Sequence, residues 1–390
     1  MRIRQYWLII FLALGTAAFL FYKEQQPPLS YHFAEDFDGN DYEHVYNYFI
    51  GVEEGFDVPF PFHQRVLVPF LAAQLNSGDI IQDFQWVNLA FTLLAIAVIF
   101  SLWRMLGFDL KWIWFGFIWL LFHWSGLIRL NAFDPITVDI PLYVFQGLFL
   151  IVLLKRKFMH LLWLAPLAIT QKESFLGLII LLVIYAWWHN RKTEDGYYDL
   201  KILLAALILS IGTLLTIEYL FSPSTAGKGA LITIAYHAKE AILNPFELIR
   251  WLAAISMAFG PAIWLTIYRY TKTRSYDNTR NLLVLFSGLY LAYGILAGGD
   301  MTRIVFLGFP FIATWIIYEL RDTKRSALIW ILVLSLPLFM LHAHIPDPAW
   351  ERELWTSWYP EFSSRRLVFI LLAYVLLISP WLYLKTRLHK

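Results

Sequence analysis

The run WVNLAFTLLAIAVIFSLW, at residues 86–103, contains no charged side chain. A helix of this length nearly crosses the hydrocarbon core of a bilayer, which takes about 20 apolar residues. Similar runs recur along the chain of 390 residues, of which 59% are hydrophobic and 15% are charged. A soluble domain has about 25% charged residues. The sequence therefore predicts an integral membrane protein.

About twelve apolar segments follow one another along the chain, and several are shorter than the roughly 20 residues of a straight span. The first, at residues 3–21, follows Arg2 and Arg4 as a signal peptide would, but no clean cleavage site comes after it. We therefore expect a retained helix there. The segments begin near Gln5, Trp86, Trp112, Ile140, Phe158, Phe175, Ile202, Trp251, Asn281, Ile304, Leu328 and Leu367.

The basic residues are distributed unevenly between alternate loops. With twelve spans and a cytoplasmic N-terminus, the cytoplasmic loops and termini hold 20 of the 31 Lys and Arg residues. An excess of positive charge on the cytoplasmic side is the usual determinant of orientation. The pattern favours an all-α, polytopic bundle of about twelve transmembrane helices, with both termini cytoplasmic. We expect a single membrane domain over residues 1–390, in the cytoplasmic (inner) membrane of a bacterium.

Polar residues gather in the loops that this topology places outside the cell. The first outer loop, residues 24–85, contains a predicted surface helix near residues 43–54, and residues 235–250 predict another. The span interiors hold almost no ionisable group, and His123, His160 and Glu218 come nearest to one. The chain has no cysteine, which excludes disulfides, thiolate metal ligands and a cysteine nucleophile.

Acidic residues precede the first predicted surface helix, in the sequence EDFDGNDY at residues 35–42. A carboxylate there could simply stabilise the start of the helix, where N–H groups are free. It could also accept a proton from a substrate, and we expect Asp38 or Asp41 to be catalytic. Asp36, Asp38 and Asp41 also offer oxygen ligands to a divalent cation such as Mg²⁺ or Mn²⁺, whose involvement the sequence leaves open.

His63 and Arg65 lie in FHQRVLVP, residues 62–69, just before the second apolar region. Basic side chains at such a place can anchor the chain at lipid headgroups. The guanidinium of Arg65 could instead hold a phosphate, because its N–H groups match phosphate oxygens in a fork. Both interpretations fit the spacing.

Further charged residues lie in other outer loops. Arg303 follows two glycines and Asp300, so that it could pair with Asp300 or meet an anion at the start of a span. Lys172 and Glu173 interrupt an apolar stretch, which costs free energy unless they pair or bind a ligand. Asp134 lies in a turn between two apolar segments. Together with the last outer loop, which contains His342 and His344, five separate loops thus bring acids and bases to one side of the membrane.

The first outer loop resembles that of the GT-C superfamily of integral membrane glycosyltransferases, which use lipid-phosphate-linked sugars. The matching residues are Asp38-Gly39 with Tyr42, and the stretch from His63 through Arg65 to Pro69. In that superfamily an acid of this loop is the catalytic base, a surface helix follows it, and an Arg and a Pro lead into the second span. The resemblance therefore implies a GT-C-like fold with its active site on the extracytoplasmic side.

The resemblance also implies a reaction, in which a sugar moves with inversion from a polyprenyl-phosphate donor to a glycan, lipid or protein acceptor, as in cell-envelope glycan biosynthesis. Nucleic acid has no part in it. Asp38 or Asp41 would be the base. The remaining predicted roles are donor-phosphate binding by Arg303, Arg65, His63 and Lys172, and sugar or acceptor binding by Glu173, Asp134, Asp300 and Tyr42.

Two alternatives stay open at this level. A twelve-span transporter or flippase of lipids or glycans has the same topology, but it usually needs charged groups and broken helices at the membrane midplane. A membrane acyltransferase would need a His–Asp pair, which His342 or His344 could form with Asp347. The two histidines could also contribute to a metal site.

Overall fold

The computed structural model describes residues 2–33, 37–192, 197–222, 229–273, 277–341, 344–360 and 362–386. Within these ranges every regular element is a helix and no strand occurs, which confirms the predicted all-α class. Contacts divide the chain into two compact units, which are described separately. The first unit comprises Met1–Ser30, Ile99–Phe133 and Ala230–Lys390, and the second comprises Tyr31–Val98 and Asp134–Gly229.

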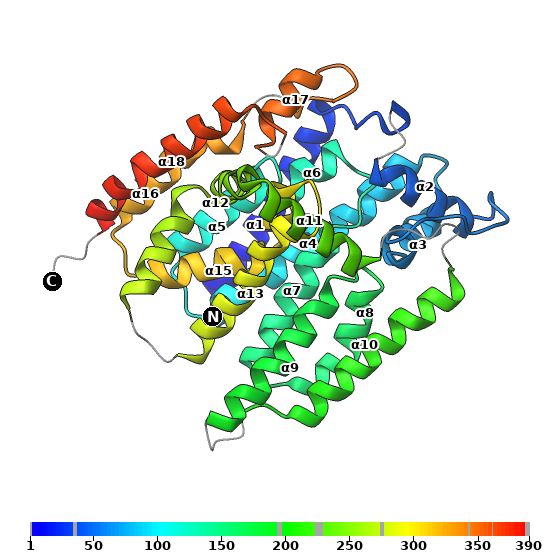
Figure 1. The fold of residues 1–390 in the computed structure, drawn as a ribbon, viewed down its shortest axis with the longest axis horizontal. Coiled ribbons are helices and arrows are strands. Elements are labelled where there is room, and N and C mark those ends of the chain that lie inside the picture. Colours follow the sequence, from blue (N-terminus) through cyan, green and yellow to red (C-terminus); the bar gives the residue numbers. More distant parts are fainter. Residues whose placement is uncertain are drawn as a thin grey trace. The chain divides into compact units, whose positions relative to one another are not determined.

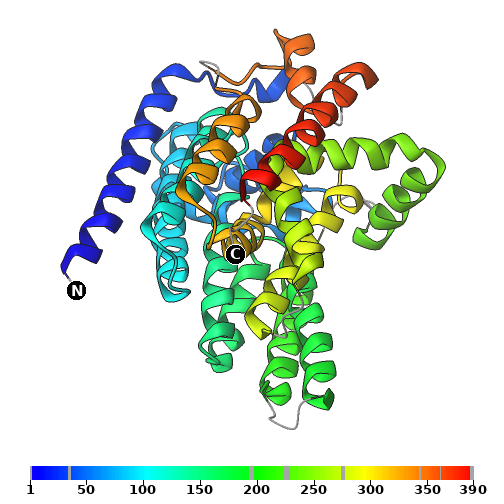
Figure 2. The same cartoon turned by 90° about the vertical axis from the view of Figure 1, so that its left-hand side faces the viewer.

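The second unit contains most of the first outer loop and the middle of the chain. In it α8, α9 and α10 pack against one another, and α2 packs on α3 (Figure 1). Figure 2 shows α9 and α10 as neighbouring green helices. Its elements, where η denotes a 3₁₀ helix, are η1 (Tyr31–Phe33), α2 (Asp38–Phe49), η2 (Phe62–Gln64), α3 (Leu67–Leu75), α4 (Ile80–Met105, which continues into the first unit), α7 (Ile140–Leu154), η3 (Phe158–His160), α8 (Leu161–Ile169), α9 (Phe175–Lys192) and α10 (Leu200–Leu220).

Helix α2 is the surface helix predicted near residues 43–54, but it begins five residues earlier. Asp38 and Asp41 lie in its first turn, where the positive end of the helix dipole stabilises their negative charge. The helix ends at Phe49, and Gly51 follows with a φ of 77°, which glycine adopts without strain. The two aspartates therefore belong to the helix itself, on the same element as Tyr42.

The first unit is built around α12. This helix packs against α14, α15 and α18, while α13 packs on α15 and α18 lies beside α16 (Figure 1). The other elements of the unit are α1 (Arg2–Gln25), α5 (Leu110–Phe122), α6 (Leu127–Phe133), α11 (Ala230–Leu243), α12 (Pro245–Lys272), α13 (Asn278–Leu296), α14 (Met301–Leu307), α15 (Phe309–Leu320), α16 (Arg325–Ser335), η4 (Leu336–Phe339), α17 (Arg352–Trp358) and α18 (Arg365–Thr386).

Helices in the first unit are interrupted at three places. The surface helix predicted at residues 235–250 is wrong as one element, because Asn244 ends it and caps the next helix by accepting a hydrogen bond from the backbone N–H of Phe246. Within α12, Gly260 has a φ of 58° and precedes a proline, which kinks the helix. Helices α14 and α15 meet at Gly308 with a bend of 69°.

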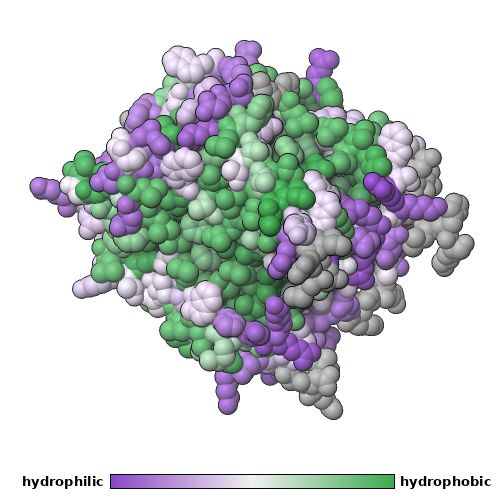
Figure 3. All heavy atoms as spheres, turned by 180° about the vertical axis from the view of Figure 1, so that it is seen from behind, coloured by the Kyte–Doolittle hydropathy of each residue, from purple (hydrophilic) through white to green (hydrophobic). Residues whose placement is uncertain are grey.

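All twelve predicted apolar segments coincide with helices, and seven of these helices are long and apolar enough to cross a membrane. The bent pair α14–α15 would make an eighth, and α7, the η3–α8 segment and the α16–η4 segment are apolar but shorter. The exact number of twelve spans therefore stays a prediction. Apolar side chains are widespread on the surface (Figure 3), among them those of Ile208 and Leu377, as lipid contact requires. The seven helices that are long and apolar enough to cross a membrane are α1, α4, the α5–α6 segment, α10, α12, α13 and α18.

At the bend between α14 and α15, Gly308 lies too close to Tyr290 for any side chain to fit without a shift. A Cβ atom there would lie 2.4 Å from the Cβ of Tyr290, whereas a Cβ at Gly288 on the same helix α13 as Tyr290 would meet nothing within 4 Å. We expect Gly308→Ala to destabilise the protein by about 1–3 kcal/mol through overpacking. Gly288→Ala should leave stability equal or slightly higher. Thermal unfolding in detergent compares the two, and equal midpoints would contradict the packing at Gly308.

Candidate functional site

Three side chains from distant segments of the second unit form a hydrogen-bonded group, here called the arginine cluster: Tyr42, Arg65 and Glu173. Arg65 follows η2, and its Nε and Nη2 donate to the two carboxylate oxygens of Glu173 over 2.8 and 2.6 Å. Its Nη1 donates to the hydroxyl of Tyr42 over 2.9 Å. This bidentate geometry is the strongest that an Arg–carboxylate pair adopts.

Burial makes the charges of the arginine cluster costly unless they are paired. The side chains of Arg65 and Glu173 are only 10% and 19% exposed. Burial opposes ionisation of Glu173, but the charge and hydrogen bonds of Arg65 outweigh it and lower the pKa of Glu173 below its usual range. Glu173 thus stays charged at neutral pH and holds Arg65 in one orientation.

Tyr42 completes the cluster from helix α2. Burial raises the pKa of Tyr42 well above its usual range, although the neighbouring Arg65 opposes this shift. The hydroxyl is therefore protonated at neutral pH. Because it accepts its hydrogen bond from Arg65, and no described residue accepts its proton, it can donate that proton to a bound molecule.

Lys172 forms a second ion pair beside the first. Its Nζ contacts the carboxylate of Asp139, which is 2% exposed and lies at the start of α7. The turn between α8 and α9 thus contributes neighbouring residues to two ion pairs. Its place is fixed further by the backbone, because the N–H of Leu67 on α3 donates to the carbonyl of Thr170 over 3.2 Å.

Tyr31 links Asp134 to the start of α2, because its hydroxyl binds Asp134 and its ring packs on Gly39. The Tyr31 hydroxyl donates to Asp134 over 2.8 Å and accepts a hydrogen bond from the backbone N–H of Ile136 over 2.8 Å. The ring of Tyr31 lies so close to Gly39 that a Cβ there would be 2.1 Å from it. Glycine at position 39, in the Asp38-Gly39 motif, is therefore required by this close approach rather than by backbone conformation.

The two candidate bases differ in their surroundings. Burial raises the pKa of Asp41 to about 6, and the charge of Asp38 adds to the shift while His44 opposes it. A carboxylate with such a pKa is mostly ionised at pH 7 and binds a proton more readily than an ordinary aspartate does. Of the two aspartates, Asp41 is therefore the better matched to base catalysis near neutrality.

His63 lies in a buried polar group with α10. Its Nε2 is 3.7 Å from a carboxylate oxygen of Glu218, and the neighbouring Gln64 donates to the same oxygen over 2.7 Å. Burial lowers the pKa of His63, and the charge of Glu218 offsets only part of the shift. His63 is therefore neutral at pH 7 and offers a phosphate a hydrogen bond rather than a charge.

The remaining predicted residues belong to the first unit or lie outside the described residues. On α14, Arg303 pairs with Asp300 over 3.6 Å, as one of the two interpretations of that sequence predicted. A role for both in the same site as the arginine cluster stays a prediction. Asp36 and His342 lie outside the described ranges. Within those ranges no three His, Asp or Glu side chains are grouped closely enough to hold a metal ion.

The His–Asp pair expected of an acyltransferase does not form between the described residues. His344 contacts Glu351 over 3.0 Å, and Asp347 accepts hydrogen bonds from the backbone and hydroxyl of Ser30 over 3.0 and 2.9 Å. Each therefore has another partner. The segment is therefore joined to Ser30, near the start of residues 24–85.

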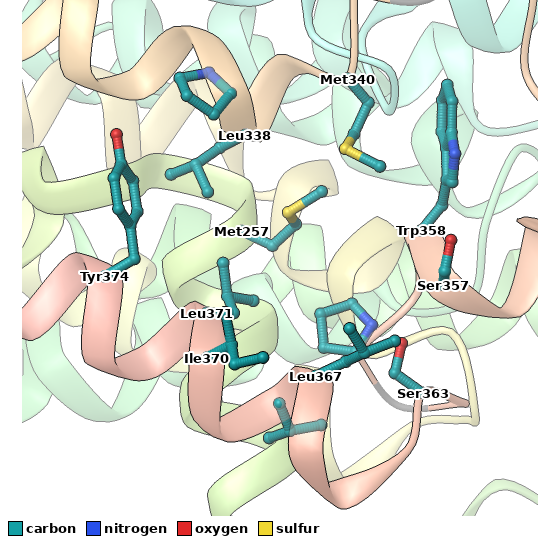
Figure 4. A pocket seen from close by; sticks show the side chains of 13 residues that line it. Met257, Leu338, Met340, Ser357, Trp358, Ser363, Leu367, Ile370, Leu371 and Tyr374 are labelled. Carbon is teal, nitrogen blue, oxygen red and sulfur yellow. The ribbon is translucent and has the colours of Figure 1, made fainter.

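Arg129 is a buried ionisable residue that the sequence pattern did not single out, and it lies near the end of the candidate span Leu110–Phe133. This residue of α6 is 1% exposed, and its Nη1 donates to the carbonyls of Phe339 and Met340 over 3.0 and 2.7 Å. Its guanidinium lies 5.6 Å from the ring of Trp358. Trp358 and Met340 also line a largely apolar cavity of about 310 Å³, on whose other side lies Tyr374 of α18 (Figure 4).

Comparisons with protein-family models, curated proteins and solved structures gave no match for the chain. Function must therefore be argued from the site. The second unit holds eight of the predicted site residues, namely Asp38, Asp41, Tyr42, His63, Arg65, Asp134, Lys172 and Glu173. It also supplies partners that the sequence pattern did not single out as site residues, namely Tyr31, Gln64, Asp139 and Glu218.

The buried ion pair of Arg65 and Glu173 predicts that removing one partner destabilises the protein more than removing both charges. Arg65→Met leaves the charge of Glu173 buried without its partner, and we expect a loss of about 3–5 kcal/mol in the free energy of unfolding. The double variant Arg65→Met/Glu173→Gln should recover much of this loss because no uncompensated charge remains. Chemical unfolding in detergent measures both values.

A matched control comes from the exposed pair of Lys111 and Asp109, whose atoms are 3.7 Å apart. Lys111→Met should change the free energy of unfolding by at most about 1 kcal/mol. Equal effects of Lys111→Met and Arg65→Met, or a double variant as unstable as the sum of the single ones, would contradict the role given to the pair.

Proposed function

We propose that this protein is a membrane glycosyltransferase of the GT-C type, with its active site in the second unit around the arginine cluster. It transfers a sugar from a polyprenyl-phosphate donor to a hydroxyl of a glycan, lipid or protein acceptor on the extracytoplasmic side. The observation that carries this proposal is a carboxylate with a pKa of about 6, Asp41, on the same helix α2 that provides Tyr42 to the buried and preorganised Tyr–Arg–Glu group.

The reaction follows from these roles. The acceptor oxygen attacks the anomeric carbon of the sugar, and its proton passes to the carboxylate of Asp41. The bond between that carbon and the phosphate oxygen breaks, and the polyprenyl phosphate leaves with the electron pair. Attack opposite the leaving group inverts the anomeric centre. Asp38 keeps the pKa of Asp41 raised, as its neighbouring charge in the first turn of α2 allows.

The leaving phosphate needs hydrogen-bond donors, because stabilising the charge that develops there is the largest contribution a site can make. Arg65 has five N–H groups, of which the cluster uses three, so that two remain for a phosphate oxygen. His63 and Lys172 are the other predicted phosphate donors in this unit. Tyr42 can donate to the sugar or acceptor, which Glu173 and Asp134 help to position, whereas the roles of Arg303 and Asp300 of the first unit stay predictions from the sequence resemblance.

A second candidate function is transport of a lipid or glycan, and the interrupted helices favour it. The 69° bend between α14 and α15 and the kink at Gly260 in α12 are features that transporters use around a binding site. Purified protein in proteoliposomes separates the two functions. Transfer of labelled sugar from a polyprenyl-phosphate donor supports the enzyme, whereas movement of intact labelled substrate without transfer supports the transporter.

The proposed base predicts a defined pH dependence. Asp41 must be ionised to accept a proton, so kcat/KM should be constant above about pH 6 and fall roughly tenfold per pH unit below it. Asp41→Asn should lower kcat by about 10²- to 10⁴-fold. Asp38→Asn should retain activity and shift the acidic limb to lower pH, because it removes the negative charge that raises the pKa of Asp41.

Glu54, an exposed acid of the same loop, provides the control, and Glu54→Gln should leave the profile unchanged. Sugar release from the polyprenyl-phosphate donor, followed from pH 4.5 to 8.5, gives the profiles. Full activity of Asp41→Asn, with thermal unfolding like that of the wild type, would remove Asp41 as the base.

A further inference from the structure

A second group of cations lies in the second unit, where the end of α7 and η3 meet the start of α10. These residues line a cleft of about 670 Å³, here called the basic cleft, whose polar lining includes Arg156, Lys157, His160, Tyr197 and Asp199. Arg156, Lys157 and His160 are exposed. The proposed reaction uses none of these residues.

The cations of the basic cleft differ from those of the candidate active site. Arg65 and Lys172 each have a carboxylate partner within the protein. No described residue forms an ion pair with Arg156 or Lys157 or accepts a hydrogen bond from either side chain. The one acid among the described residues that line the cleft, Asp199, accepts a hydrogen bond from the N–H of Ile202 and so caps α10. The described part of the cleft therefore presents Arg156 and Lys157 to an external anion.

Arg156 is held in position by its backbone and by a ring. Its φ of 55° is in the left-handed region, which costs a non-glycine residue roughly 1–2 kcal/mol. Its guanidinium lies 3.7 Å from the centre of the Tyr197 ring. Because the N–H groups of a guanidinium point outward in its plane, stacking on a ring leaves them able to donate. The guanidinium N–H groups of Arg156 can therefore donate hydrogen bonds to a ligand in the cleft.

The surface beside the basic cleft is apolar. Helix α10 starts at the cleft and is long enough to cross a membrane, yet only 22% of its most apolar stretch is buried. Ile208 on α10 and Trp163 on α8 are 68% and 53% exposed. Trp163 also donates from its ring N–H to His160 over 3.4 Å, as a tryptophan at a headgroup boundary can. The cleft therefore adjoins an exposed apolar surface formed by α8 and α10.

We propose that the basic cleft binds the headgroup of an anionic phospholipid, with its acyl chains along the exposed faces of α8 and α10. The phosphate accepts hydrogen bonds from Arg156 and Lys157, and Met159, Trp163 and the start of α10 surround the glycerol region. Basic pockets between membrane helices bind anionic headgroups by this combination of charge and apolar surface. The lipid is a bound component of the protein and not a substrate of the proposed transfer.

Native mass spectrometry of the delipidated full-length protein tests the proposal. Phosphatidylglycerol and phosphatidylcholine with identical acyl chains are added separately. We expect wild-type protein to retain the anionic lipid with clear preference, and Arg156→Gln/Lys157→Gln to lose about tenfold or more in affinity for it, since each basic residue contributes roughly fivefold. Lys157→Gln alone, a change at an exposed position, should show an intermediate loss.

The matched control is Arg104→Gln/Lys111→Gln, which removes the same charge from another short basic loop and should bind phosphatidylglycerol as the wild type does. Equal affinities for the two lipids in wild-type protein, or equal losses in the two double variants, would overturn the proposal. Displacement of the lipid by millimolar inorganic phosphate would also overturn it, because the site would then recognise free phosphate. Similar thermal unfolding midpoints of all variants establish that each is folded.

Discussion

The bidentate ion pair between Arg65 and Glu173 is the interaction on which the candidate site depends. The two residues are 108 positions apart in the sequence, and their pairing joins the segment between η2 and α3 to the turn between α8 and α9. Removing either partner would leave a charge in a mostly buried place, at a cost of several kcal/mol. The pair therefore restricts the chain to arrangements in which these two segments meet.

The same pair determines what the neighbouring groups can do. Arg65 orients Tyr42 through a hydrogen bond, and this contact fixes helix α2, which also carries the candidate base Asp41, beside the segment that follows η2. Lys172 and Asp139 extend the network from the same turn. Because protein carboxylates already neutralise both cations, an incoming phosphate must be recognised through the remaining N–H groups of Arg65 and through other donors.

Much of the fold could be predicted from the sequence, because apolar runs such as residues 86–103 determine helices directly. The boundaries were less predictable: α2 begins at Asp38, since the carboxylates favour a helix start, whereas aromatic residues suggested a later one. The site was predictable as a set of charged residues in outer loops. Its pairing was not, because any of several acids could have met Arg65, and only three-dimensional packing selects Glu173. The burial of Arg129 could not be predicted, because the carbonyls that it binds belong to Phe339 and Met340, more than 200 positions away in the sequence.

The contact between the two segments can be measured directly, because the chain contains no cysteine. The backbones of Leu67 and Thr170 share a hydrogen bond, so cysteines at these positions lie within reach of a short thiol-specific cross-linker and leave the ion pair intact. The cross-linker should join the two thiols of Leu67→Cys/Thr170→Cys within one chain and consume both, whereas it should not join those of Leu75→Cys/Thr170→Cys, roughly 12 Å further along α3. Two unjoined thiols in the folded, cross-linker-treated Leu67→Cys/Thr170→Cys protein would contradict the account.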